Sequence, residues 1–210
     1  GTSIGISTLF GAQKITVQNC TVHDIVGTAS LWPSGAGLYN MYTTDCSFVG
    51  NLVYNVNTTD TSKWTCGIND GFNTRGLYAR NIIRDIGPPG FVHGYEIANT
   101  GTVVRGSTGT MLYHNVFDNV DNMVRPAEGS SGTVVKNNIA VNTREAAVLN
   151  WDAWGAISTS YNLFYNVAAT HGLNCSRGIG DFIADPQFVG GGDYHVLSTS
   201  PAIDSGTDIG

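Results

Sequence analysis

The feature that most constrains this chain is a pair of residue series that recur together along its length. The first series is Cys20, Asn51, Asn81, Asn115, Asn138 and Asn162. The second series follows four residues later and is Asp24, Asn55, Asp85, Asn119, Asn142 and Asn166. Successive members of the second series are 31, 30, 34, 23 and 24 residues apart. Recurrence at intervals of this size is typical of repeat proteins.

The residues between the recurring positions predict strands rather than helices. Apolar residues alternate in short bursts such as 15–17, 134–135 and 164–167, bounded by Asn and Gly. Repeats that vary in length suit a solenoid in which each repeat is one coil and loops absorb the variation. We therefore predict an all-β parallel β-helix of about six to seven coils. Neighbouring coils are expected about 4.8 Å apart.

Asparagine suits a position that repeats once per coil. It tolerates the left-handed backbone conformation of a tight turn, and its amide both donates and accepts hydrogen bonds. Amides that lie over one another in successive coils can therefore bond along the solenoid axis. The recurrence predicts such an Asn ladder.

Composition excludes several classes of function. Charged residues make up 12% of the chain, against about 25% in ordinary globular proteins. The net charge of −6 and the lack of a basic run argue against nucleic-acid binding. No apolar run approaches the length of a membrane-spanning helix, so membrane insertion is not expected. The four cysteines (Cys20, Cys46, Cys66 and Cys175) fall at different points of the coils, which favours free thiols.

Each coil is expected to contain three strands, and residues 1–184 are expected to form the coils. The first coil is predicted to be incomplete, with further sequence upstream of Gly1. The longest loops lie near residues 29–33, 58–64 and 87–94. Residues 185–210 are predicted to close the same domain.

The end of the chain carries a family resemblance. Asp185-Pro186-Gln187-Phe188, then Asp193-Tyr194-His195-Val196-Leu197, then Ser200-Pro201-Ala202-Ile203-Asp204-Ser205-Gly206 resembles the closing segment of secreted bacterial proteins with the right-handed parallel β-helix, the pectate-lyase-like superfamily. The resemblance implies a right-handed solenoid that is secreted or displayed at the cell surface. It also implies a polysaccharide or cell-surface glycan as partner. Asp193 and His195 are assigned to the closing structure rather than to catalysis.

Enzymes of this superfamily bind substrate along one parallel sheet. The third apolar patch of each coil, at 38–39, 68, 95–97, 123–124, 148–149 and 179, is the expected sheet because it follows the variable loops. The polar neighbours of these residues are expected to face outward. These are Asn40, Asn69, Asp70, His93, Glu96, Arg125, Glu128, Asn150 and Asp152, and the aromatic residues beside them are Tyr39, Tyr95, Trp151 and Trp154.

Two mechanisms suit this polar stripe. Hydrolysis needs two carboxyl groups, for which Asp70 and Glu96 are the first choice. Elimination from a uronate needs a base and a cation that neutralises the carboxylate. Arg125 and His93 could serve, with Ca²⁺ bound by Asp70 and Glu96. No other cofactor is implied. The remaining candidates Asn40, Asn69, Tyr95, Glu128, Asn150, Trp151 and Asp152 would bind substrate.

A second function class stays open, that of a non-catalytic surface, fibre or adhesion module, and homo-oligomerisation stays open with it. The Asn-Lys-Ser and Arg-His-Gly signatures of alginate- and chondroitin-type lyases are absent from the sequence. Two further sets of residues are assigned to solvated edges of turns rather than to a site. They are His23, Arg84 and Asp118 after the first series, and Arg80, His114 and Lys136 before it.

Overall fold

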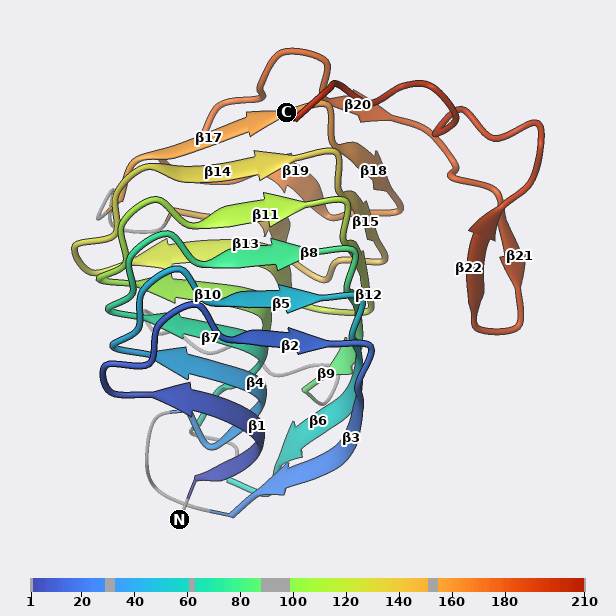
Figure 1. Ribbon diagram of the computed structural model, residues 1–210. Coiled ribbons are helices and arrows are strands. Elements are labelled where there is room, and N and C mark those ends of the chain that lie inside the picture. The colour runs from blue at the N-terminus through green and yellow to red at the C-terminus, as the bar shows by residue number, and fades with distance from the viewer. Residues whose placement is uncertain (1, 29–32, 61–62, 88–98, 151–154, 210) are drawn as a thin grey trace.

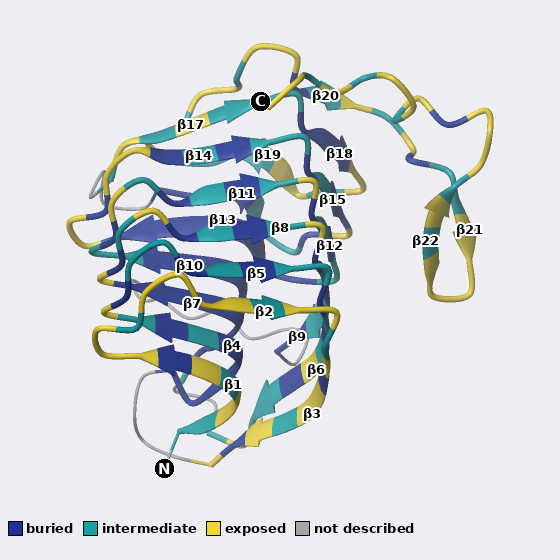
Figure 2. Ribbon diagram, in the orientation of Figure 1, coloured by how far each residue is buried: buried dark blue, intermediate teal, exposed yellow. Residues whose placement is uncertain are grey.

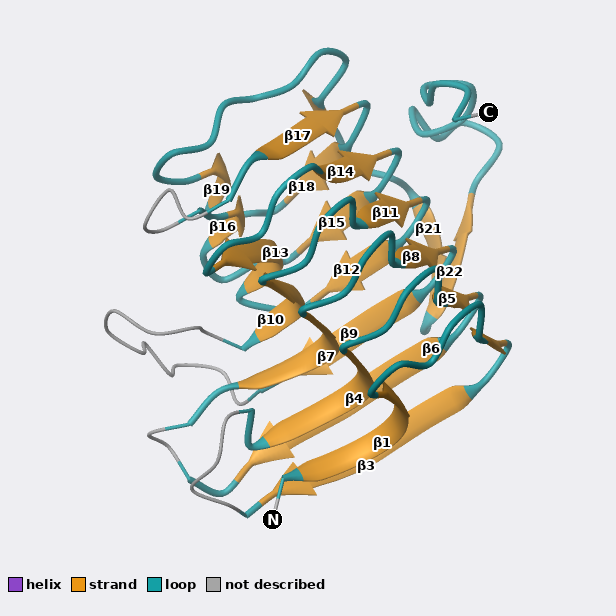
Figure 3. Ribbon diagram, turned by 60° about the vertical axis from the view of Figure 1, so that its left-hand side comes forward, coloured by secondary structure: helices purple, strands orange, loops and turns teal. Residues whose placement is uncertain are grey.

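The computed structural model describes residues 2–28, 33–60, 63–87, 99–150 and 155–209. The described chain is built from strands, loops and turns (Figure 3). It winds as a right-handed parallel β-helix whose coils rise from the N-terminal to the C-terminal end (Figure 1). The predicted fold class and coil number are therefore confirmed. Among the described residues, no helix has the length and apolar character needed to cross a lipid bilayer.

Three parallel sheets form the walls of the solenoid. The first sheet contains β1 (Ser3–Leu9), β4 (Gly35–Met41), β7 (Thr65–Gly71), β10 (Thr100–Arg105), β13 (Asn122–Ala127), β16 (Ala146–Val148) and β19 (Ala169–His171). The second sheet contains β2 (Thr16–Gln18), β5 (Ser47–Val49), β8 (Leu77–Ala79), β11 (Met111–Tyr113), β14 (Thr133–Lys136) and β17 (Ile157–Ser160). The third sheet contains β3 (Thr21–Gly27), β6 (Leu52–Thr58), β9 (Ile82–Ile86), β12 (Val116–Asp118), β15 (Ile139–Val141), β18 (Leu163–Tyr165) and β20 (Phe182–Ile183).

The first residue series forms a buried ladder between the second and third sheets. In each step from Asn51 to Asn162, one Asn Oδ1 accepts two hydrogen bonds from the Asn one coil earlier. For example, Asn138 Oδ1 accepts from the backbone N–H and the Nδ2 of Asn115, both at 2.9 Å. The ladder begins at the backbone of Cys20, which donates to Asn51 Oδ1, and it ends at Asp181, which accepts from Asn162. These bonds satisfy buried polar groups that would otherwise destabilise the corner.

The second series also aligns, but at the surface. All six of its residues have φ between 49° and 55°, the left-handed conformation that Asn and Asp tolerate better than most side chains. Their side chains bond between neighbouring coils, as in Asn119 Nδ2 to Asp85 Oδ1 at 2.8 Å. Both alignments that the sequence predicted are confirmed. The structure adds that one column is internal and the other external.

Apolar side chains from all three sheets fill the interior. The core includes Phe48, Ile68, Tyr78, Ile83 and Phe117, each fully buried. A column of glycines in the first sheet allows the third sheet to approach closely. A Cβ on Gly67 would lie 2.3 Å from Ile83 Cγ2, and one on Gly101 would lie 2.4 Å from Phe117 Cδ1. Larger residues at these positions would displace the core.

One expected strand position in the first sheet is wrong, and another lies outside the described residues. In the third coil the strand is β10, so the predicted patch at 95–97 lies before it and outside the described residues. In the last coil the strand is β19, whereas Ile179 is 77% exposed and pairs as an isolated bridge with Ser160. All four cysteines are free, and Cys46 and Cys66 are buried.

The C-terminal segment packs along the side of the solenoid. Its two strands β21 (Phe188–Gly190) and β22 (Asp193–Val196) form an antiparallel hairpin beside the third sheet (Figure 1). Tyr194 Oη donates to Asp118 Oδ2 at 2.7 Å, and the Asn137 amide bonds the backbone of Thr207 in both directions. Much of the segment is exposed (Figure 2). The hairpin part of this segment lies against a wall of the solenoid.

Candidate functional site

The polar stripe predicted on the first sheet is only partly on its outer face. Asn40 and Asp70 are fully buried and point into the solenoid, so the expectation that they face solvent is wrong. Asp70 Oδ1 accepts from Tyr78 Oη at 2.6 Å, and its other oxygen accepts from the Thr110 hydroxyl. Asn40 Nδ2 donates to the same Tyr78 oxygen at 2.8 Å. Burial raises the pKa of Asp70, and its hydrogen bonds oppose that shift.

The outer face of the first sheet is closed rather than open. Asn69 and Arg125 lie on this face but are only 5% and 6% exposed. Asn150 is also buried and donates to the Gly155 carbonyl oxygen at 2.8 Å. Glu128, by contrast, is exposed and bonds the Arg105 guanidinium at 2.6 Å. Side chains buried in this way cannot line an open sugar groove without rearrangement.

The other predicted site residues lie outside the described part of the chain. They are His93, Tyr95, Glu96, Trp151 and Asp152. The proposed pairing of Asp70 with Glu96 therefore has one member in the solenoid interior and one member not described. Among the described residues, no group of three or more His, Cys, Asp or Glu side chains is placed to hold a metal ion.

A more accessible polar surface lies on the third sheet. In strand register, His23 is beside Tyr54, Tyr54 beside Arg84, and Arg84 beside Asp118. Each of these residues comes three positions after a member of the buried ladder. The column therefore carries one polar or aromatic side chain per coil. We call the surface formed by this column and the adjoining Asp24–Asn55–Asp85–Asn119 column the polar strip.

Side chains in the polar strip stack on one another. The rings of His23 and Tyr54 are nearly parallel, with centroids 5.0 Å apart, and the Arg84 guanidinium carbon lies 4.4 Å from the Tyr54 centroid. This cation–π contact holds Arg84 over the ring. The ring faces are thus occupied within the stack, whereas the ring edges and polar tips remain available to a ligand.

Ion pairs link the two columns of the polar strip. His23 Nδ1 lies 2.8 Å from Asp24 Oδ2, and Arg84 Nη1 lies 2.5 Å from Asp85 Oδ2. The side chains of His23 and Asp24 are 46% and 62% exposed. Hydrogen bonds from His23 and Asn55 lower the pKa of Asp24, so it is ionised at neutral pH. The strip therefore presents carboxylates, amides and cations together.

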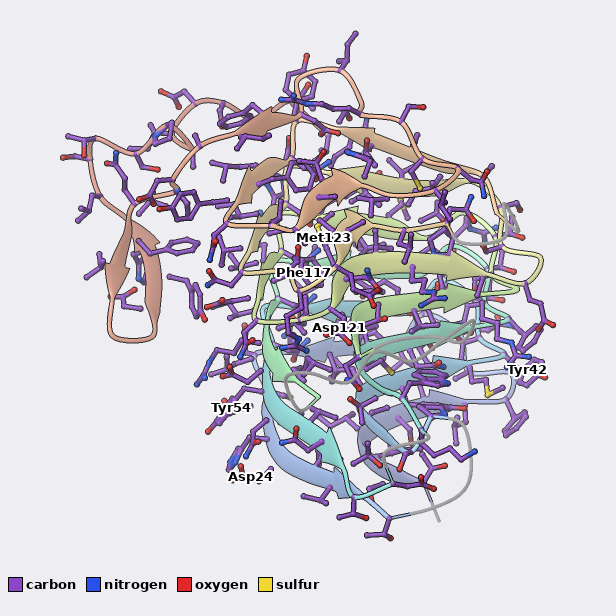
Figure 4. All side chains as sticks on the ribbon, turned by 180° about the vertical axis from the view of Figure 1, so that it is seen from behind. Asp24, Tyr42, Tyr54, Phe117, Asp121 and Met123 are labelled. Carbon is purple, nitrogen blue, oxygen red and sulfur yellow. The ribbon has the colours of Figure 1, made fainter. Side chains whose placement is uncertain are left out.

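The C-terminal hairpin forms a wall at one end of the strip. Tyr194 contacts Asp118 there, and a cleft of about 360 Å³ lies between the hairpin and the solenoid. Its lining comprises Arg80, Asn81, Ile82, His114, Val116, Gly192, Asp193, Tyr194 and His195. Figure 4 shows Asp24 and Tyr54 on the side of the molecule that carries the hairpin, while Tyr42 lies at the opposite edge.

Sequence reasoning placed most of these residues but gave them no role. The sequence pattern assigns His23, Arg84 and Asp118 to a solvated edge and does not single out Tyr54. The available signal was the fixed spacing of three residues after each ladder position, which yields His, Tyr, Arg and Asp in successive coils. The contribution of the hairpin could not be read this way, because its contact with Asp118 joins residues 76 positions apart.

Comparison with known proteins adds little to this description. No family model matches the chain, and no curated protein matches it. Among solved structures, the full-length plasmid-mediated fluoroquinolone resistance protein QnrB1 is similar at 7% identity over 82% of this chain and 95% of that chain, with a TM-score of 0.24. A trypsin-treated form of QnrB1 is 8% identical over 84% and 93% of the two chains, with a TM-score of 0.20. The fold description rests on the sheet register and the Asn ladder.

Proposed function

We propose that this chain is a glycan-binding β-helix module whose binding surface is the polar strip beside the C-terminal hairpin. The observation that carries the proposal is the regular repetition of exposed or half-buried polar side chains in two columns, one residue per coil. Coils about 4.8 Å apart repeat on the scale of a single sugar ring. A linear polysaccharide laid along the axis would therefore meet similar groups at each residue.

The chemistry of the polar strip supports a hydroxyl-rich ligand. Asp24, Asp85 and Asp118 offer acceptors, Arg84 offers donors, and Asn55 offers both. The Tyr54 ring edge and hydroxyl lie between them, and aromatic residues with a polar tip suit ligands that are partly apolar and partly wet. Binding is favoured over cleavage because Asp70, the first choice for catalytic acid, lies in the interior. Because its proposed partner is a glycan, we expect the protein to act outside the cell, either secreted or at a cell surface.

The test is affinity electrophoresis in native gels that contain polygalacturonate, alginate, xylan or dextran. The unmodified protein should migrate more slowly in at least one polymer. Tyr54→Ala removes the centre of the stack and releases Arg84, so affinity should fall about fivefold, which corresponds to about 1 kcal/mol. Retardation by none of the polymers, or equal retardation of Tyr54→Ala, would contradict the proposal.

Tyr42→Ala is the matched control for this substitution. Tyr42 is also a partly exposed aromatic residue in a stack, with Phe10 at 5.3 Å and Phe72 at 5.1 Å, but it lies at the opposite edge of the molecule. Its removal should leave polysaccharide affinity unchanged. Incubation with the same polymers, followed by measurement of reducing ends and unsaturated products, tests the catalytic alternative. A protein that binds no polymer and assembles into oligomers would favour the fibre or adhesion module.

A further inference from the structure

The cleft between the hairpin and the solenoid contains an arginine whose side chain pairs with none of the described residues. Arg75, Arg84, Arg105 and Arg144 each pair with a carboxylate. The Arg80 side chain forms neither an ion pair nor a hydrogen bond with any described residue, although the chain carries a net charge of −6. An uncompensated guanidinium in a cleft is suited to a carboxylate or sulfate, which it can bind through two parallel hydrogen bonds.

Arg80 is supported by a second basic group on the next coil. The backbone N–H of Arg80 donates to Tyr113 O at 3.0 Å, which places His114 directly beyond it along the axis. Both residues have the left-handed backbone of the corner, with φ of 56° and 57°, and both line the cleft. Burial and the nearby Arg80 lower the pKa of His114. An anion bound between the two side chains would counter both effects.

Other titratable groups in the cleft belong to the hairpin. Asp193 Oδ1 lies 2.5 Å from His195 Nδ1 and also accepts from the His195 backbone N–H at 2.9 Å. These contacts lower the pKa of Asp193 and commit its carboxylate to its own strand. Tyr194 is engaged with Asp118, and this contact together with burial raises its pKa, so its hydroxyl is neutral in the ordinary pH range. Arg80 and His114 are thus the basic groups that the solenoid contributes to the cleft, and His195 is the basic group that the hairpin contributes.

We propose that Arg80 and His114 form a subsite for an anionic substituent of the glycan, a carboxylate or a sulfate ester. This inference rests on the proposed function and adds a chemical class of ligand to it. The cleft borders the polar strip through Ile82, which precedes Arg84 by two residues on β9. A polymer bound along the strip would therefore bring its substituents to Arg80. Protonation of His114 would add a second positive charge and strengthen binding as the pH falls.

The experiment compares three polymers by affinity electrophoresis at pH 8 and pH 5.5. Polygalacturonate carries carboxylates, dextran sulfate carries sulfate esters, and dextran is neutral. Arg80→Gln should weaken binding of an anionic polymer about tenfold, because one charge-assisted contact is lost. If the unmodified protein binds a neutral polymer, Arg80→Gln should bind that polymer with the same affinity. Lys14→Gln is the charge-matched control, since Lys14 also has a left-handed backbone, with φ of 55°, at another corner.

Two further variants test the pH dependence. Affinity for dextran sulfate should rise from pH 8 to pH 5.5 in the unmodified protein and in His195→Gln, and should rise clearly less in His114→Gln. The subsite is overturned if Arg80→Gln and Lys14→Gln lose equal affinity, or if His114→Gln retains the full rise. If neutral polymers bind and anionic polymers bind no more tightly, this inference fails while the proposed function stands. If no polymer binds, the proposed function itself fails.

Discussion

The two Asn-rich columns of this solenoid contain similar residues at the same period, yet they have different structural roles. The inner column, for example Asn81 and Asn115, is buried and bonds both the backbone and the side chain of the neighbouring coil. The outer column, for example Asn55, is exposed and bonds only side chains. In the inner column the amide itself is required, whereas in the outer column the backbone conformation is required and the side chain is available for binding. Residue type and spacing alone do not separate these roles.

The largest expected effect on stability is at the middle of the inner column. Asn115 Oδ1 accepts from Asn81 twice, and Asn115 Nδ2 donates to Tyr78 O and to Asn138 Oδ1. Asn115→Ala would leave several of these buried groups without partners and should lower the free energy of unfolding by about 3 kcal/mol. Urea unfolding followed by circular dichroism measures this. A loss below about 1 kcal/mol would contradict a structural role for the ladder.

An intermediate effect is expected for the buried carboxyl group. Asp70→Asn would place an amide N–H₂ against the hydroxyls of Tyr78 and Thr110, and should lower the free energy of unfolding by about 2 kcal/mol at acidic pH. Because burial raises the folded-state pKa of Asp70, its stabilising contribution is complete below the ordinary aspartate pKa. It is lost as the pH rises through the raised value. The stability difference between the wild type and Asp70→Asn should therefore shrink from pH 4 to pH 8.

The outer carboxylates give the matched contrast. The pKa of Asp24 is lowered, so its contribution is present above the ordinary aspartate pKa and is lost as the pH falls through the lowered value. The stability difference between the wild type and Asp24→Asn should be smaller, should grow as the pH rises to the ordinary aspartate pKa, and should not shrink above it. The same pH trend in both variants would show that inner and outer carboxylates do not differ as described.

The smallest stability effect is expected in the outer column. Asn55 has φ of 54°, so Asn55→Ala should lower the free energy of unfolding by about 1 kcal/mol through backbone strain. Asn55→Gly accepts this conformation and should remain close to the wild type. Thermal unfolding of the two variants separates conformation from hydrogen bonding. Equal destabilisation by Ala and Gly would mean that the amide, rather than the backbone, is the important feature.

The period of the chain was sufficient to predict the fold. Ladder positions such as Asn81 and Asn138 recur with short strands before them, and a parallel solenoid is the arrangement that aligns both series. The side-chain directions in the first sheet were predicted less well. Strict alternation from the buried Ile68 places Asp70 inside, two positions later, whereas every polar neighbour of the apolar patch is expected from the sequence on the outer face. The interior accepts Asp70 because Tyr78 of the same coil and Thr110 of the next coil supply donors.

The candidate site was harder to predict because it depends on contacts that are distant in sequence. The stacking of His23, Tyr54 and Arg84 requires three coils in register, and each residue alone is an ordinary surface side chain. The contact between Tyr194 and Asp118 requires the C-terminal segment to lie beside the third sheet. The family resemblance directed attention to the first sheet, whose outer face is largely buried at Asn69 and Arg125.

The most direct test of the binding surface is carboxyl footprinting with carbodiimide and glycine ethyl ester, read by mass spectrometry. It is done with and without a neutral polysaccharide that retards the protein in gels. Asp24 and Glu128 are matched probes, because their side chains are 62% and 57% exposed, and Glu128 belongs to the surface first expected to bind sugar. We expect the polysaccharide to slow modification of Asp24 and to leave Glu128 unchanged. Protection of Glu128 with Asp24 unchanged would contradict the assignment of the polar strip.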